Sequence, residues 1–313
     1  MTMHIHRSIL AIAVLAPLLH GDATLRYHTD VKTATGIPGL PSGASLADMS
    51  SMRDMVVRVK GNKAYSEQGH LTSILDLTTQ EMTLIDAPHK LFAKVPAGKY
   101  AELAKSAIPV VPEEARVALA SMKTSVDSRN TGRTAAIQGV QSEEHEFVLS
   151  IEMPAGGPPL AGPMMKMLVQ IWTAKAEEAQ RIPALQEVQN YTASASGAVN
   201  PVELIAQVFS AVPGLGDSLT SMIADMTKSG SVSMRVHTEV TMPFLAVMAQ
   251  PGVPLPPGLD PGAPLMQMNQ ELVELSTDPL DDALFQVPQD YLPASLEEIL
   301  KGVAAAPAPV AQQ

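Results

Sequence analysis

The chain has 313 residues, with 32 acidic against 21 basic ones and a net charge of −11. Its few Lys and Arg residues form no cluster, which argues against binding to nucleic acid or anionic lipid headgroups, since both need a concentrated basic surface. The absence of cysteine excludes disulfides, thiol nucleophiles, Cys-ligated zinc and iron–sulfur clusters.

The first 23 residues have the three regions of a secretory signal peptide. Arg7 supplies the positive charge, residues 8–19 form an apolar run, and Gly21 and Ala23 are small residues of the kind that a signal peptidase reads. The apolar run is too short for a stable membrane span. We therefore expect cleavage after Ala23 and a mature protein that is periplasmic or secreted, in a bacterium. The alternative is an uncleaved N-terminal anchor.

Short strands separated by tight turns are predicted in the first part of the mature chain. Apolar and polar residues alternate at 55–60, and Gly61 with Asn62 then forms a two-residue hairpin signal. The strands expected in this part are 25–31, 55–60, 63–67, 71–77, 82–86 and 90–95. Their connections are too short for crossover helices, so the strands should pair in antiparallel hairpins.

Helices and strands are both predicted in the rest of the chain. Helices are expected at 97–108, 112–122 and 175–188, and strands at 123–128, 134–137, 147–153, 167–174, 231–242, 268–276 and 283–287. An amphipathic helical hairpin is expected as an insertion at 195–227. Residues 251–264 form a loop rich in Pro and Gly, and 304–313 a disordered Ala/Pro tail. The sum predicts one α+β domain over residues 24–303.

Several segments carry a resemblance to a known family. These segments are residues 55–65, 72–86, 90–95, 137–147, 172–175 and 279–288. Together they resemble a family of secreted bacterial proteins of unknown function, which is similar to the lipoprotein-carrier (LolA/LolB-like) proteins. The resemblance implies a curved antiparallel half-barrel, closed by helices over a cavity for acyl chains. It implies no catalytic residues, and the segments at 195–227 and 251–264 depart from the family pattern.

The candidate binding residues are apolar. A Met- and Val-rich sheet face under helices would form an adaptable cavity, because methionine fills apolar space without fixing its shape. The residues expected to line it are Phe209, Met222, Met226, Met234, Val236 and Met242. Ordinary core packing is the alternative for each of them.

Three motifs invite chemical interpretations. Residues 216–219 spell the Gly-Asp-Ser-Leu block of a class of esterases, with Ser218 as nucleophile, but no Asp-x-x-His follows, and Asp217 also suits a helix cap. The methionines at 164–167 and 266–268 suggest copper(I), or apolar packing. The scattered histidines show no metal-ligand spacing. No catalytic residue, metal or cofactor is therefore assigned.

The composition and pattern predict a non-enzymatic protein that binds or shields an apolar ligand, such as a lipid, an acyl chain of a lipoprotein or an amphipathic segment. One alternative is a structural or interaction protein of the cell envelope without a ligand. The other is an esterase that uses Ser218.

Overall fold

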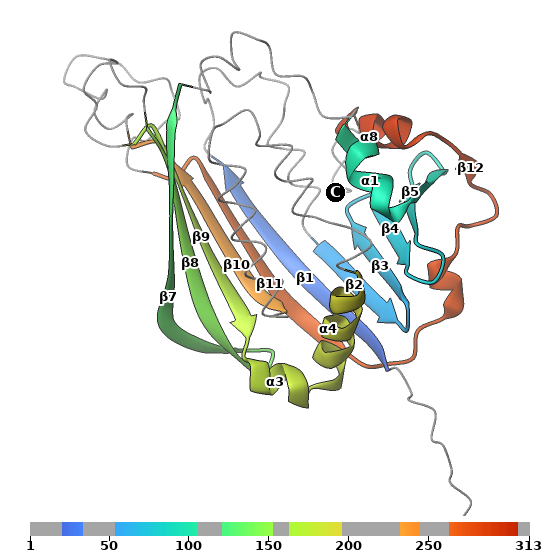
Figure 1. Ribbon diagram of the computed structural model, residues 1–313, viewed down its shortest axis with the longest axis horizontal. Helices are drawn as coiled ribbons and strands as arrows, with labels where there is room; N and C mark the ends of the chain where they lie inside the picture. The colour runs from blue at the N-terminus through green and yellow to red at the C-terminus, as the bar shows by residue number, and fades with distance from the viewer. Residues whose placement is uncertain are drawn as a thin grey trace, which may run out of the picture.

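The computed structural model describes residues 21–33, 54–105, 121–152, 163–195, 232–243 and 263–305. Within them, twelve strands form one open sheet (Figure 1). The strands are β1 (Asp22–Thr33), β2 (Asp54–Lys60), β3 (Lys63–Gln68), β4 (Leu71–Asp76), β5 (Glu81–Asp86), β6 (Leu91–Pro96), β7 (Lys123–Ile137), β8 (Val140–Glu152), β9 (Met165–Ala174), β10 (Ser233–Thr241), β11 (Met266–Ser276) and β12 (Leu292–Pro293).

The sheet consists of two meanders that meet at β1. Its order is β12-β6-β5-β4-β3-β2-β1-β11-β10-β9-β8-β7, and all neighbours are antiparallel except β12 and β6. Tight hairpins join β2 to β6, and the first is the two-residue hairpin that the sequence predicted at Gly61 and Asn62, with a φ of +55° at Gly61. β1 pairs with β2 on one side and β11 on the other. The strand nearest the N-terminus therefore lies in the middle of the sheet.

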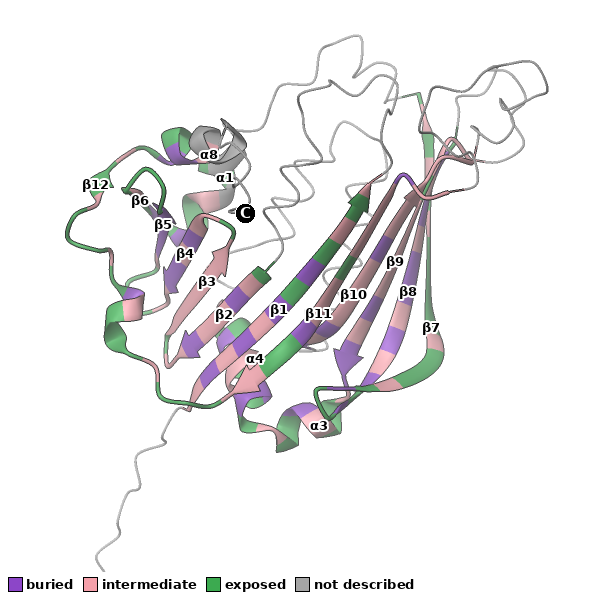
Figure 2. Cartoon of the chain, turned by 180° about the vertical axis from the view of Figure 1, so that it is seen from behind, coloured by how far each residue is buried: buried purple, intermediate pink, exposed green. Residues whose placement is uncertain are grey.

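The main hydrophobic core lies between one face of the sheet and the helices α4 (Pro183–Ala195) and α8 (Leu296–Ala305). Leu25, Val59 and Leu84 are fully buried there, with Leu185 of α4 and Ile299 of α8. Tyr191 donates a hydrogen bond from Oη to the carbonyl of Leu75 over 3.0 Å, which ties α4 to β4. Figure 2, which views the chain from behind, shows that buried residues recur along the strands.

The opposite face of β3 to β6 is covered by the segment that follows β11. The short helix η3 (Asp282–Phe285) begins this cover, with Asp281 as its N-cap. Phe285 packs on Ile74 and Ile85 in a second, smaller core. The chain then continues as β12, which pairs with β6, and as α8 on the main-core side. The C-terminal segment thus packs on both faces of the meander that precedes it.

The fold class predicted from the sequence is wrong: the described residues are mainly β, and their few short helices do not form the helical cover expected of an α+β half-barrel. The remaining described helices are short, namely η2 (Ala97–Lys99), α1 (Tyr100–Lys105) and α3 (Ala176–Arg181). α4 packs on β1 and β2, and α8 on β5 and β6. The predicted helix at 112–122 and the predicted helical hairpin at 195–227 lie almost entirely outside the described residues.

Several strands differ in extent from the prediction: β7 and β8 are longer, β4 and β10 are shorter, and the strand expected at 283–287 is wrong, because η3 occupies most of it. The segments 123–128 and 134–137 were expected as separate strands around a Gly-containing turn. Instead they form the single strand β7, and its pairing with β8 shifts between Asn130 and Thr134. Gly132 accommodates this bulge with a φ of +71°. No helix among the described residues is long and apolar enough to cross a membrane.

Candidate functional site

One face of β8 to β11 carries rows of apolar side chains. Because side chains alternate along a strand, residues paired across the sheet share a face. The first row, from β8 to β1, consists of Phe147, Val169, Thr238, Met268 and Val31. The second consists of Leu149, Met167, Val240 and Met266, and the third of Ile151 and Met165. We call these eleven residues the apolar rows.

The apolar rows lie on the face that α4 covers farther along β1. Leu25 and Tyr27 belong to the main core with α4, and Val31 follows them at the alternating spacing of the same strand. Phe147, Leu149 and Ile151 are buried, whereas the methionines and Val169 and Val240 are half-buried. No side chain in the rows is charged, and Thr238 supplies their one hydroxyl, while Thr33 of β1 continues the second row opposite Met266. This surface therefore suits a ligand without polar groups along its length.

The described residues include three of the six residues predicted to line a cavity. Met234 is fully buried in the main core, at the bulge where β10 shifts its pairing with β9, so it packs the interior. Val236 shares the face of the apolar rows, opposite Ile171 and Gln270, and is half-buried. Met242 is half-buried just after β10. Phe209, Met222 and Met226 lie outside the described residues.

Sequence reasoning missed most of the apolar rows. The methionines of β9 and β11 were treated as copper ligands or as local packing, although Met167 and Met266 both flank Val240 in one row. The available signal was the alternation in residues 147–153, which predicted a half-buried strand. Which strands lie beside it depends on pairing between distant segments, and the sequence pattern does not indicate this pairing.

The opposite face of the same strands is polar and cross-linked. Arg235 stacks over the ring of Trp172 at 5.9 Å and donates to Glu271 over 2.7 Å. In the neighbouring row, His237 Nδ1 lies 2.6 Å from Oδ1 of Asn269. These contacts join β9, β10 and β11, so the sheet separates an apolar face from a charged one.

Two buried carboxylates on β8 end this polar face. Glu146 accepts hydrogen bonds from Gln170 over 3.0 Å and from Nε of Arg129 over 2.8 Å. The hydrogen bond from Gln170 is the main reason why the pKa of Glu146 lies below its usual value. The hydrogen bond from Arg129 and the charges of Arg129 and Arg133 lower this pKa further. Glu144 pairs with Arg133 and accepts from Thr131 over 2.6 Å. Because every one of these charges is partnered, the cluster stabilises the strand edge and offers no free acid or base.

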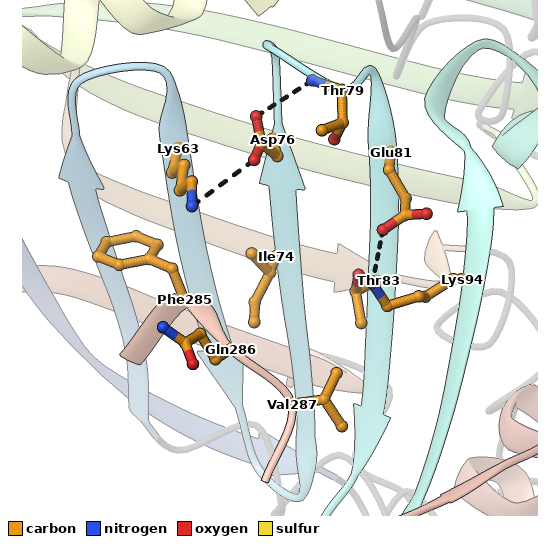
Figure 3. Close-up of a pocket in the computed structure, with 10 residues that line it drawn as sticks. All are labelled: Lys63, Ile74, Asp76, Thr79, Glu81, Thr83, Lys94, Phe285, Gln286 and Val287. Carbon is orange, nitrogen blue, oxygen red and sulfur yellow. Dashed lines mark hydrogen bonds and ion pairs between the residues drawn. The ribbon is translucent and has the colours of Figure 1, made fainter. Parts of the chain in front are cut away.

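A groove of about 410 Å³ lies between β3 to β6 and the segment after η3 (Figure 3). Ile74, Phe285 and Val287 form its apolar part. Its charged groups neutralise one another: Lys94 donates to Glu81 over 2.8 Å, and Nζ of Lys63 lies 3.7 Å from Asp76. Asp76 also accepts from the backbone N–H groups of Thr78 and Thr79, so it is a turn residue. The groove is a less favourable ligand site than the apolar rows, because a ligand must displace these pairs.

The chemical motifs lie partly outside the described residues. Ser218 lies outside the described residues, and His237, the histidine downstream of it, contacts Asn269 and lies 3.9 Å from Glu239. Within the part of the chain that the structure describes, no three His, Asp or Glu side chains are grouped to hold a metal ion.

Comparisons with known proteins give no family. No family model matches the chain, and no curated protein does. Among solved structures, a chain of PNGF-II matches with a TM-score of 0.32 and 8% identity, over 90% of this chain. This chain spans about a third, 33%, of the length of that chain. A likeness this low supports no conclusion about fold or activity, and the lipoprotein-carrier resemblance stays a prediction.

Proposed function

We propose that the protein is a non-enzymatic, extracytoplasmic protein that holds an acyl chain against the apolar rows. The observation that supports this most is the contrast between the two faces of β8 to β11. The polar face is cross-linked by ion pairs and hydrogen bonds, whereas the other face presents half-buried thioether and aliphatic groups. The methionines suit such a ligand, because their unbranched side chains adapt to chains of different shape.

The dimensions of the apolar rows also fit a long acyl chain. The first row crosses from β8 to β1, and four strand intervals of about 4.8 Å give roughly 19 Å. Phe147 is the single aromatic residue in the rows, so stacking on a sugar or a planar ring is poorly supported. A saturated chain needs only apolar contact along this length, and that contact is what the rows provide.

The proposal is tested by titrating the purified mature protein with a fluorescent fatty acid. We expect saturable binding, and lipid in an organic extract of the protein analysed by mass spectrometry. A phospholipid or free fatty acid in the extract identifies a lipid source, whereas a co-purifying acylated polypeptide identifies a lipoprotein. A lipid-free extract together with no uptake of the probe contradicts the proposal and favours the envelope structural protein.

A pair of variants separates the two faces. Met167→Glu places a carboxylate in the second apolar row, and we expect it to weaken fatty-acid binding at least about tenfold, because the charge must be desolvated by the ligand. Leu168→Glu is the matched control, since Leu168 is the next residue and lies opposite Glu239 on the polar face. Equal binding by both variants, with circular dichroism confirming that they are folded, would show that the apolar rows do not hold the ligand.

A further inference from the structure

The first residues of β1 are built into the middle of the sheet. Ala23 is fully buried in the main core and pairs with Val59 of β2. Asp22 pairs with Lys60, and its Oδ2 accepts a hydrogen bond from the backbone N–H of Leu280 over 2.5 Å. The sequence alone predicted cleavage after Ala23, which would remove both residues from the folded protein.

Losing Asp22 and Ala23 would damage the junction between β1 and the C-terminal segment. Lys60 donates from Nζ to the carbonyl of Leu280 over 2.6 Å and pairs with Asp282 over 2.8 Å. Asp22 therefore completes a set of contacts that fixes the chain where it leaves β11 for η3. Without these two residues, the N–H of Leu280 loses its acceptor, and Val59 loses its neighbour in the sheet.

The surroundings of Gly21 suit a newly formed N-terminus. Oε1 of Glu187 on α4 lies 3.8 Å from the position that a Cβ on Gly21 would occupy. Glu187 thus lies beside Gly21, the residue that precedes the α-ammonium group formed on Asp22. Gly21 and Ala23 are both small residues of the kind that a signal peptidase accepts directly before the cut, unlike His20 or Asp22, so the structural contacts of Asp22 and Ala23 distinguish the two sites. Ala16 is small as well, but it lies inside the apolar run that ends at Leu19.

We propose that the export signal is removed between Gly21 and Asp22, so that the mature protein begins with the first residue of β1. Hydrolysis of this peptide bond by water leaves a carboxylate on Gly21 and an ammonium group on Asp22. The proposal rests on the expectation that the N-terminal segment is an export signal, and it does not depend on the acyl-chain ligand.

The cut is located by expressing the full chain with a C-terminal affinity tag in a Gram-negative host. The protein is recovered from the periplasm, and its intact mass is measured by mass spectrometry. We expect the mass of a chain that starts at Asp22. A mass that starts at Thr24, at any other residue, or at the intact N-terminus overturns the proposal.

A second measurement tests the physical reason for the cut. Chains that start at Asp22 and at Thr24 are produced with a removable leader, and their thermal melting is compared. We expect the Thr24 chain to melt about 5 °C lower or more, because a buried strand end and a hydrogen bond are lost. Asp22→Ala in the longer chain should give part of this loss. Equal melting temperatures would show that the two residues do not contribute as inferred.

Discussion

The buried carboxylate of Asp86 is partnered by a single histidine. Its side chain is 1% exposed, Oδ2 contacts Nδ1 of His89 over 2.7 Å, and Oδ1 has no hydrogen-bond partner. We expect His89→Ala to lower the free energy of unfolding by about 2 kcal/mol, because both carboxylate oxygens are then buried without a partner. Urea unfolding measures this change.

The control for that variant is His28→Ala. His28 Nδ1 lies 2.9 Å from Oδ1 of Asp54, but both side chains are about 60% exposed. Water replaces the lost partner there, so we expect a change of about 0.5 kcal/mol or less. Similar losses for both variants would contradict the role assigned to burial.

Glu146 should make stability depend on pH in the acidic range. Its pKa is lower in the folded protein than in the unfolded chain, chiefly because of the hydrogen bond from Gln170. The stabilisation is therefore present above the unfolded pKa, near 4.3, and is lost as the pH falls through the folded value. We expect Glu146→Gln to reduce the slope of stability against pH below about pH 4.3. Urea unfolding at several pH values tests this, with the exposed Glu152→Gln as control.

At the scale of elements, α4 is held on the sheet by its buried face. Leu185 is fully buried against the sheet, whereas its neighbour Gln186 is exposed. We expect Leu185→Ala to cost about 3 kcal/mol of unfolding free energy, because it leaves a cavity in the main core. Gln186→Ala should change stability by about 0.5 kcal/mol or less. Chemical denaturation of both variants makes the comparison, and a loss below 1 kcal/mol for Leu185→Ala would contradict the packing described.

The elements predictable from the sequence are those specified locally. The hairpins from β2 to β6 were predicted because turn residues such as Gly61 interrupt alternating strands every few residues. The segment predicted as one helix at 97–108 begins with the 3₁₀ helix η2 and continues as α1 to Lys105, where the described part of this segment ends. Apolar spacing alone does not determine whether a short segment becomes a helix, since the packing of the whole chain decides.

The candidate site was less predictable than the strands. Alternation along β10 predicts that Met234 and Val236 share one face of the sheet. Met234 is fully buried in the main core, whereas Val236, farther along the same strand, is half-buried. Which part of a face is covered depends on contacts between distant segments, and the sequence of a single strand does not reveal those contacts.

At the scale of the molecule, the long-range pairing of β1 with β11 joins the two meanders of the sheet. Arg26 on β1 donates to Glu274 on β11 over 2.9 Å across 248 residues of sequence. Joining segments so far apart requires closing a very large loop, which slows folding. No local pattern indicates this pairing, which merges two meanders into one twelve-stranded sheet.

The central position of β1 also means that the molecule has a natural line of division. Each meander is contiguous in sequence, apart from the C-terminal segment, which returns to pack on the first. Two polypeptides, one ending and the other beginning between Lys105 and Ser121, would each keep all of their own hairpins. Fragment complementation should therefore restore the native sheet when the two are co-expressed, with the edges of β1 and β11 acting as complementary halves of a binding interface.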